Sequence, residues 1–99
     1  MTRTKMDGVI EAVHYTADGK IAIIRVYERH GVVWSDQILL NRNELSERLM
    51  QGKRFVVGVR KNNLGSIFET GTRVYEIEGN IVTEGQTSVR DLLTGVPVF

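Results

Sequence analysis

The run Lys20–His30 constrains the fold most, because it is the longest strand-like stretch in the chain. Side chains along a strand alternate between two faces, so Ala22, Ile24 and Val26 share one apolar face. The opposite face begins apolar and ends basic and aromatic, with Ile21, Ile23, Arg25, Tyr27 and Arg29. Such a strand is buried on both sides in its first half and meets water on one side in its second half. The run therefore predicts the middle of a curled sheet or small barrel.

A hairpin is predicted immediately before this strand. Gly8–Thr16 alternates β-branched and aromatic residues, which favours a strand. Asp18-Gly19 is the favoured pair for a two-residue type I′ turn, and that turn sets Ile10 opposite Tyr27. After the long strand, Val32–Leu40 predicts a third strand by the same alternation.

The period then changes to that of a helix. Asn41 stands at a helix N-cap and Glu44 follows three residues later, which is the arrangement of a capping box. Two leucines spaced four apart give a short apolar stripe, and Gly52 is the expected C-terminal glycine. These signals predict one helix over residues 42–51.

The second half of the chain returns to strand-like alternation. Strands are predicted over Arg54–Lys61, Ser66–Thr70, Arg73–Glu78 and Ile81–Glu84. Gly71 separates the second of these from the third, and Gly79-Asn80 fits a two-residue hairpin loop. A final helical turn is predicted over 88–93, with Ser88 as its cap.

These elements predict a single domain over residues 1–99, mostly β (α+β), in the order β-β-β-α-β-β-β(-β). This order suits a small antiparallel β-barrel or roll, because meanders that bury one face tend to close or be covered. It is similar to the OB-fold in element order only, since the strands after residue 70 exceed a minimal OB-fold. A split barrel or roll of other connectivity fits equally. Residues 1–6 are predicted to be flexible, and the tail 95–99 either stays free or packs on the barrel.

The composition excludes several kinds of chemistry. The chain has no cysteine, so disulfides, thiolate metal sites and cysteine nucleophiles are ruled out. No signal-peptide region opens the chain, and no apolar run approaches the roughly 18 residues of a membrane helix. Loops that cradle nucleotides and the nucleophile elbow of hydrolases are missing too. We therefore expect a soluble, cytoplasmic, non-enzymatic protein with no cofactor and no membrane contact.

The two histidines do not form a plausible metal site. Metal sites need clustered ligands, and the predicted hairpin places His14 opposite Ile23. His30 lies beyond the far end of that hairpin. The sequence therefore predicts no metal site.

Basic and aromatic residues give the first candidate site. The net charge of the chain is only +1, but residues 1–61 hold eleven Lys and Arg against seven Asp and Glu. Proteins that bind single strands combine a positive groove with aromatic rings on which bases stack. We expect single-stranded RNA or DNA to contact Arg25, Tyr27, Arg29, Trp34, Arg54, Arg60 and Lys61. The alternative is that the aromatic rings pack in the core and the arginines pair across strands.

Apolar residues give a second candidate of a different class. The long strand carries Ile21 and Ile23 on its second face, and the tail ends in Val98 and Phe99. Exposed apolar patches mark surfaces that bind partners, and exposed strand edges invite pairing. These four residues predict a protein–protein interaction or homo-oligomerisation module.

Overall fold

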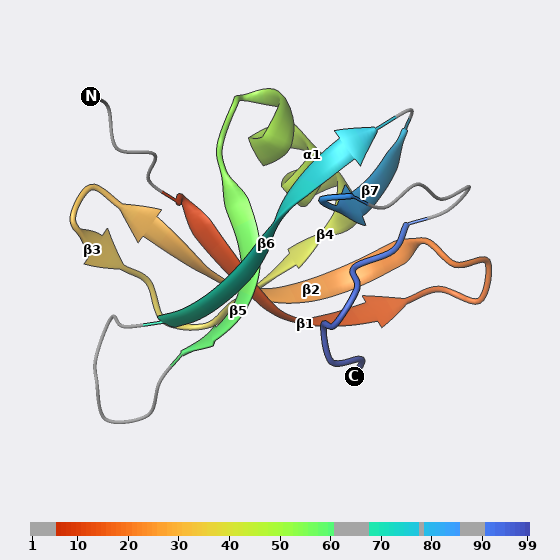
Figure 1. The fold of residues 1–99 in the computed structure, drawn as a ribbon, viewed down its shortest axis with the longest axis horizontal. Coiled ribbons are helices and arrows are strands. Elements are labelled where there is room, and N and C mark those ends of the chain that lie inside the picture. The colour runs from red at the N-terminus through yellow and green to blue at the C-terminus, as the bar shows by residue number, and fades with distance from the viewer. Residues whose placement is uncertain (1–5, 61–67, 78, 86–90) are drawn as a thin grey trace.

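The computed structural model describes residues 6–60, 68–77, 79–85 and 91–99 (Figure 1). The elements in order are β1 Gly8–Tyr15, β2 Ile21–His30, β3 Val33–Trp34, β4 Ile38–Asn41, α1 Arg42–Met50, β5 Phe55–Arg60, β6 Phe68–Ile77 and β7 Asn80–Thr83. The predicted class, mostly β with one helix after the early strands, is confirmed.

The predicted antiparallel barrel, by contrast, is wrong for the described strands. They form one mixed, open sheet in the order β3-β2-β1-β5-β6-β7, with β4 beside β3 on the same edge of β2. β1 and β5 pair in parallel through Gly8–Ile10. Parallel neighbours need a long crossover, and here β2, β3, β4 and α1 all lie within that crossover. The OB-like arrangement is likewise unsupported.

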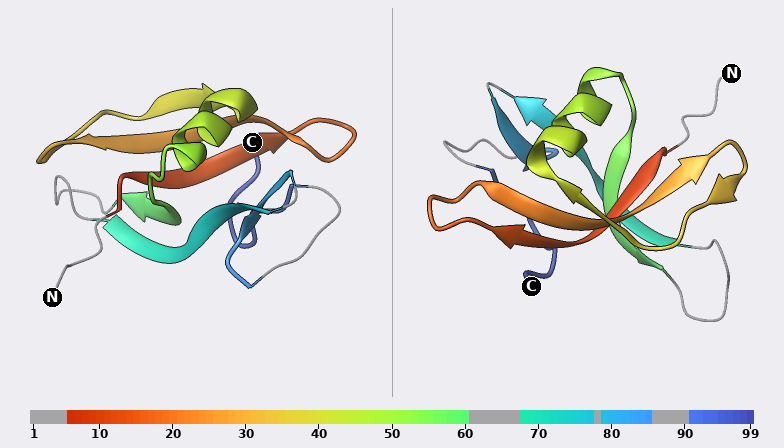
Figure 2. Two further views of the ribbon diagram at one scale, coloured as in Figure 1. Left: turned by 90° about the horizontal axis from the view of Figure 1, so that it is seen from above. Right: turned by 180° about the vertical axis from the view of Figure 1, so that it is seen from behind.

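The sheet is strongly twisted, and its strands splay apart on the side where α1 lies (Figure 2). The core fills the space between the splayed layers. It consists of Ile10, Val13, Ile21, Ile24, Val26, Leu40, Leu45, Phe55, Val74, Ile81, Leu93 and Val96. The predicted core face of the long strand is confirmed at Ile24 and Val26, both 0% exposed.

The first hairpin has a longer turn than predicted. The Gly19 N–H donates to the Thr16 carbonyl at 3.0 Å, and the Thr16 N–H donates to the Lys20 carbonyl at 2.7 Å. Gly19 has φ 84°, so this is a type I turn closed by a left-handed glycine, a three-residue loop. The Thr16 hydroxyl also accepts from the Lys20 N–H at 3.2 Å and donates to the Asp18 carboxylate. These side-chain bonds favour the longer loop.

The register of this hairpin matches the prediction only in its middle. Beside the turn Tyr15 pairs with Ile21, whereas a two-residue turn would set it opposite Ala22. His14 pairs with Ile23, as predicted. The pairing shifts between Ile10 and Ala12, so Glu11 has no partner on β2 and Tyr27 lies opposite Val9 instead of Ile10. A β-bulge of this kind adds one residue to one strand and increases the local twist.

The predicted third strand, Val32–Leu40, is interrupted. The structure replaces it with β3 and β4, separated by residues 35–37. At the break the Ser35 N–H donates to the Glu28 carbonyl at 2.8 Å. The Ser35 hydroxyl oxygen accepts from the Glu28 N–H at 3.0 Å. The serine side chain therefore satisfies a backbone group that a regular ladder would have paired.

Two other boundaries differ from the prediction. Ser66–Thr70 and Arg73–Glu78 were expected as separate strands, but β6 runs without a break through Gly71. Leu92 does not belong to a helical turn, because it forms a bridge with Val82 of β7. Residues 88–90 of that predicted turn lie outside the described part of the chain.

The helix begins and ends as its sequence signals predict. The Asn41 side chain accepts from the Glu44 N–H at 2.8 Å, and the Glu44 carboxylate accepts from the Asn41 N–H at 2.9 Å. At the other end Gly52 has φ 84°. Its N–H donates to Leu49 at 3.0 Å, and the Lys53 N–H donates to Arg48 at 3.1 Å, which is a Schellman motif.

Replacing the cap tests how much this local geometry stabilises the domain. We expect Asn41→Ala to lower the free energy of unfolding by about 1 kcal/mol, because the Glu44 N–H loses its acceptor. Urea denaturation measures the change. Asn43→Ala is the matched control, since Asn43 is exposed within the first turn and alanine is the better helix former there. Equal losses in the two variants would contradict a capping role for Asn41.

Candidate functional site

The aromatic residues proposed for base stacking pack against one another. Tyr27 is only 8% exposed. Its ring centroid lies 5.3 Å from that of Phe68, and the Trp34 ring lies 4.7 Å from the same phenylalanine. Phe68 is the first residue of β6, so its ring brings the start of that strand against Tyr27. The cluster leaves only a half-buried Trp34 and Phe68 within reach of a ligand.

Two arginines of the same predicted set, Arg25 and Arg29, have partners within the chain. The Arg25 guanidinium lies 4.2 Å from the centroid of the Phe99 ring. Arg29 Nε donates to the Met6 carbonyl at 3.0 Å, and its Nη2 lies 3.6 Å from Asp7 Oδ1. Arg54 is half-buried just before β5. The structure therefore divides this set between the Phe99 side of the sheet and the Phe68 cluster.

The side chains of the last two basic residues of the set lie outside the described structure. The Arg60 backbone ends β5 and pairs with Phe68, but its side chain lies outside the described structure. Lys61 lies wholly outside the described residues. Their predicted contacts with phosphate remain predictions.

A bulge separates the two isoleucines of the second predicted set. Tyr15 pairs with Ile21 and His14 with Ile23, so Ala22 has no partner on β1. Ile21 consequently turns into the core and is 2% exposed, whereas Ile23 is 38% exposed. A buried Ile21 offers no surface to a partner, and strict alternation could not have revealed this.

The segment Val96–Phe99 lies along the second half of β1. The Val13 N–H donates to the Pro97 carbonyl and the Phe99 N–H donates to the Val13 carbonyl, each at 2.9 Å. His14 Nδ1 also contacts the backbone oxygen of Phe99. Of the two alternatives for the tail, packing is observed. Val98 remains 67% exposed at the margin of the sheet and Phe99 38% exposed.

Three apolar side chains meet solvent on one face of β2, β4 and the C-terminal segment beside β1. We call Ile23, Leu39 and Phe99 the outer-face patch. Leu39 lies directly opposite Arg25, whose guanidinium covers Phe99, and Leu39 is 58% exposed. The sequence prediction omitted Leu39. Its alternation with Ser35 and Gln37 places it on a polar face, and that pattern could have identified it as an exposed leucine.

The patch borders an open edge of the sheet. β4 pairs with β2 alone among the described strands, and Figure 2 shows β3 and β4 along the outside of their layer. Val32 and Val33 on this edge are 93% and 64% exposed. Native edges are usually protected by lysine, proline or inward charges. Val32–Leu40 contains neither lysine nor proline, and Asp36 is its one charged residue.

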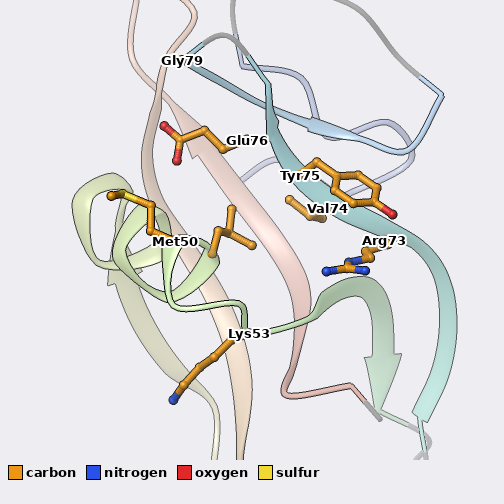
Figure 3. A pocket seen from close by; sticks show the side chains of 8 residues that line it. Met50, Lys53, Arg73, Val74, Tyr75, Glu76 and Gly79 are labelled. Atoms are coloured by element: carbon orange, nitrogen blue, oxygen red, sulfur yellow. The ribbon is translucent and has the colours of Figure 1, made fainter. Parts of the chain in front are cut away.

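A groove lies elsewhere, between the end of α1 and β6 (Figure 3). It has a volume of about 450 Å³, and its lining includes Leu49, Met50, Lys53, Arg73, Val74 and Glu76. The pattern of β-alternation gave no sign of it, because the groove joins residues from a helix end and a distant strand.

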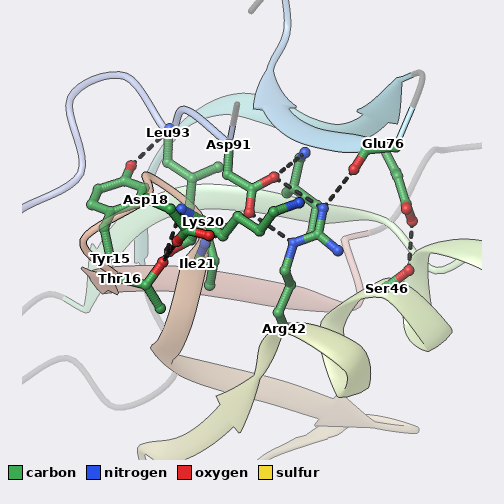
Figure 4. A network of polar contacts seen from close by, with 12 residues as sticks. Tyr15, Thr16, Asp18, Lys20, Ile21, Arg42, Ser46, Glu76, Asp91 and Leu93 are labelled. Carbon is green, nitrogen blue, oxygen red and sulfur yellow. Dashed lines mark hydrogen bonds and ion pairs between the residues drawn. The ribbon is translucent and has the colours of Figure 1, made fainter. Parts of the chain in front are cut away.

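A buried ion pair ties four segments together (Figure 4). Asp91 accepts from Arg42 Nε at 2.7 Å and from Arg42 Nη2 at 3.1 Å. It also accepts from the backbone N–H groups of Ile21 at 2.7 Å and Ile81 at 2.8 Å. Its side chain is 0% exposed. These contacts make Asp91 the residue that joins β2, α1 and β7.

The described residues contain no group of three or more His, Cys, Asp or Glu side chains that could hold a metal ion. No helix among them is long and apolar enough to cross a membrane.

No protein-family model matches the chain, and searches of the curated proteins and of the solved structures also found no match.

Proposed function

We propose that this domain is a non-enzymatic interaction module that forms a symmetric homodimer through the β3–β4 edge and the outer-face patch. The observation that carries the proposal is an unpaired sheet edge bordered by exposed apolar side chains. Val33 is 64% exposed and Leu39 is 58% exposed, and large exposed apolar surfaces commonly mark interfaces.

A second copy is the partner that fits this edge most simply. Two β4 strands related by a twofold axis run antiparallel, so each completes the other's open ladder and the two sheets become continuous. An axis beside Leu39 brings both copies of that residue together. Asp36 is the only formal charge on the edge, and it lies at the end away from such an axis. Like-charge repulsion therefore does not oppose the pairing.

Single-stranded nucleic acid is the competing outcome. The rings of Tyr27 and Trp34 already pack on Phe68, and stacking platforms need rings that bases can reach. Arg25 and Arg29 also have partners within the chain. Most of the rings and arginines that would bind nucleic acid are thus engaged within the chain. The backbone groups of the outer edge of β4 have no strand beside them among the described residues.

Sedimentation of the wild type and of Leu39→Lys tests the dimer. Burying a leucine contributes about 1.5–3 kcal/mol, and a symmetric dimer loses two such side chains. We expect the dissociation constant to rise by at least about a hundredfold, since each 1.4 kcal/mol is a factor of ten. A charge on the edge also opposes strand pairing.

Ile77→Lys is the matched control, because Ile77 is 46% exposed at the end of β6, away from the patch. We expect it to dimerise like the wild type. A wild type that stays monomeric at high concentration contradicts the proposal. If Trp34 fluorescence then responds to single-stranded RNA or DNA, and affinity falls steeply with salt, the nucleic-acid function replaces it.

A further inference from the structure

Arg73 points into the groove between α1 and β6 without a full set of partners. Figure 3 shows its guanidinium directed toward the space beside Val74, while the Tyr75 ring points away from the helix. The guanidinium carbon lies 4.8 Å from the centroid of that ring. The contact holds the guanidinium in place but accepts none of its N–H groups in a conventional hydrogen bond.

Arg73 Nε is buried and has no hydrogen-bond partner among the described residues. Buried polar side-chain atoms are paired in the large majority of cases, so an unpaired one needs an explanation. Arginine carries five donors in a rigid fork and no acceptor. A partner for this guanidinium is therefore an acceptor, and its charge favours an anion. Because Nε itself is closed to solvent, the Nη groups are the donors that a ligand can reach.

The nearest carboxylate of the groove is already engaged elsewhere. Glu76 Oε1 accepts from the Ser46 hydroxyl at 2.6 Å, and no ion pair joins Glu76 to Arg73 among the described residues. Lys53 lies exposed at the rim, with its amino group directed away from Arg73 in Figure 3, so it acts on the groove only through its charge. With Arg73 and Lys53 against Glu76, the formal charge of the groove is positive.

We propose that this groove binds a small molecule that carries a carboxylate or phosphate group on an apolar body. Two oxygens of the anion accept from the two Nη groups of Arg73, at the end of the fork that Figure 3 shows directed into the groove. Lys53 adds a second positive charge at the rim. The apolar body lies against Leu49, Val74 and Met50. The volume of about 450 Å³ falls within the usual range for ligand sites.

This site is independent of the proposed dimer, because the groove is lined by α1 and β6, and the dimer uses β3, β4 and the outer face. Nuclear magnetic resonance of the arginine Nε–H signals provides a direct test. The probes are inorganic phosphate, phenyl phosphate and octanoate, each titrated into the full chain. We expect the Arg73 Nε–H signal to move with all three, and phenyl phosphate to bind more tightly than inorganic phosphate.

Variants then separate a site from general attraction of anions. We expect Arg73→Gln to weaken phenyl phosphate binding by about tenfold or more, and Lys53→Gln to weaken it less and mainly at low salt. Lys20→Gln at the exposed hairpin is the control and leaves binding unchanged. An Arg73 signal that no probe moves, or equal affinity for inorganic and phenyl phosphate, overturns the proposal. If Arg73→Gln fails to fold, two results still overturn the proposal. One is an Arg73 signal in the wild type that no probe moves, and the other is equal binding by Lys53→Gln and Lys20→Gln at low salt.

Discussion

Asp91→Ala is expected to lower the free energy of unfolding by about 3–5 kcal/mol, the usual effect of removing one partner from a buried ion pair. The substitution leaves the Arg42 guanidinium without its carboxylate. It also removes the acceptor of two backbone N–H groups, those of Ile21 and Ile81. Each buried donor left unpaired destabilises the folded state further. Because the network joins β2, α1 and β7, the loss affects the whole core.

Chemical denaturation measures this loss, and Asp36→Ala supplies the control. Asp36 is exposed, so its removal is expected to change stability by no more than about 0.5 kcal/mol. Asp91→Asn keeps the shape and one good acceptor oxygen, and its stability should lie between those of the wild type and Asp91→Ala. A loss in Asp91→Ala as small as that in Asp36→Ala would show that the ion pair does not stabilise the fold.

The pH dependence of the same pair has a definite sign. Burial raises the pKa of Asp91, but hydrogen bonds from Arg42 and from the backbone of Ile81 and Ile21 outweigh it, so the pKa lies below its ordinary value. A carboxylate with a depressed folded-state pKa stabilises the protein above its unfolded pKa of about 3.9. That stabilisation is lost as the pH falls through the folded-state pKa. The difference between wild type and Asp91→Ala should therefore narrow below about pH 4.

Local signals predicted the helix well, because its ends depend on residues within one turn. Asn41, Glu44 and Gly52 each make the bonds that their positions in the sequence favour. The pairing of His14 with Ile23 also matches the prediction, but the turn beside it is one residue longer than predicted and the bulge at Ala22 offsets the difference. For the helix, whose deciding contacts span few residues, the sequence pattern was sufficient.

Contacts between distant segments decided the rest. The bulge at Ala22 reverses the side to which Ile21 points and sends it into the core, and a second bulge leaves Glu11 without a partner on β2. The parallel β1–β5 pair joins residues about as far apart as half the chain. Asp91 meets Arg42 across 49 positions, a separation that no motif marks. The candidate site was mispredicted for the same reason. Phe68 packs on Tyr27, and the alternation pattern did not show that the strand with Phe68 lies next to Tyr27.

Gly8→Ala is expected to lower the free energy of unfolding by about 3 kcal/mol through overpacking. A Cβ at this position would lie 2.4 Å from a ring carbon of Phe55 and within 2.8 Å of two others. Phe55 is 0% exposed and belongs to the core, so its ring has little room to move. The absence of a side chain at Gly8 is thus what allows the phenylalanine to fit beside β1, where the parallel pair begins.

A double-mutant cycle isolates this contact. Phe55→Leu alone removes buried volume and costs stability, but it also removes the ring that obstructs the new methyl group. We expect Gly8→Ala with Phe55→Leu to be more stable than the sum of the single losses by at least about 1 kcal/mol. Gly58→Ala is the control, because there the Cβ would lie 2.4 Å from the backbone oxygen of Glu69, which Phe55→Leu does not move. Equal rescue of both glycine variants would mean that Phe55→Leu loosens the core generally and that the Phe55 ring does not specifically require a glycine beside it.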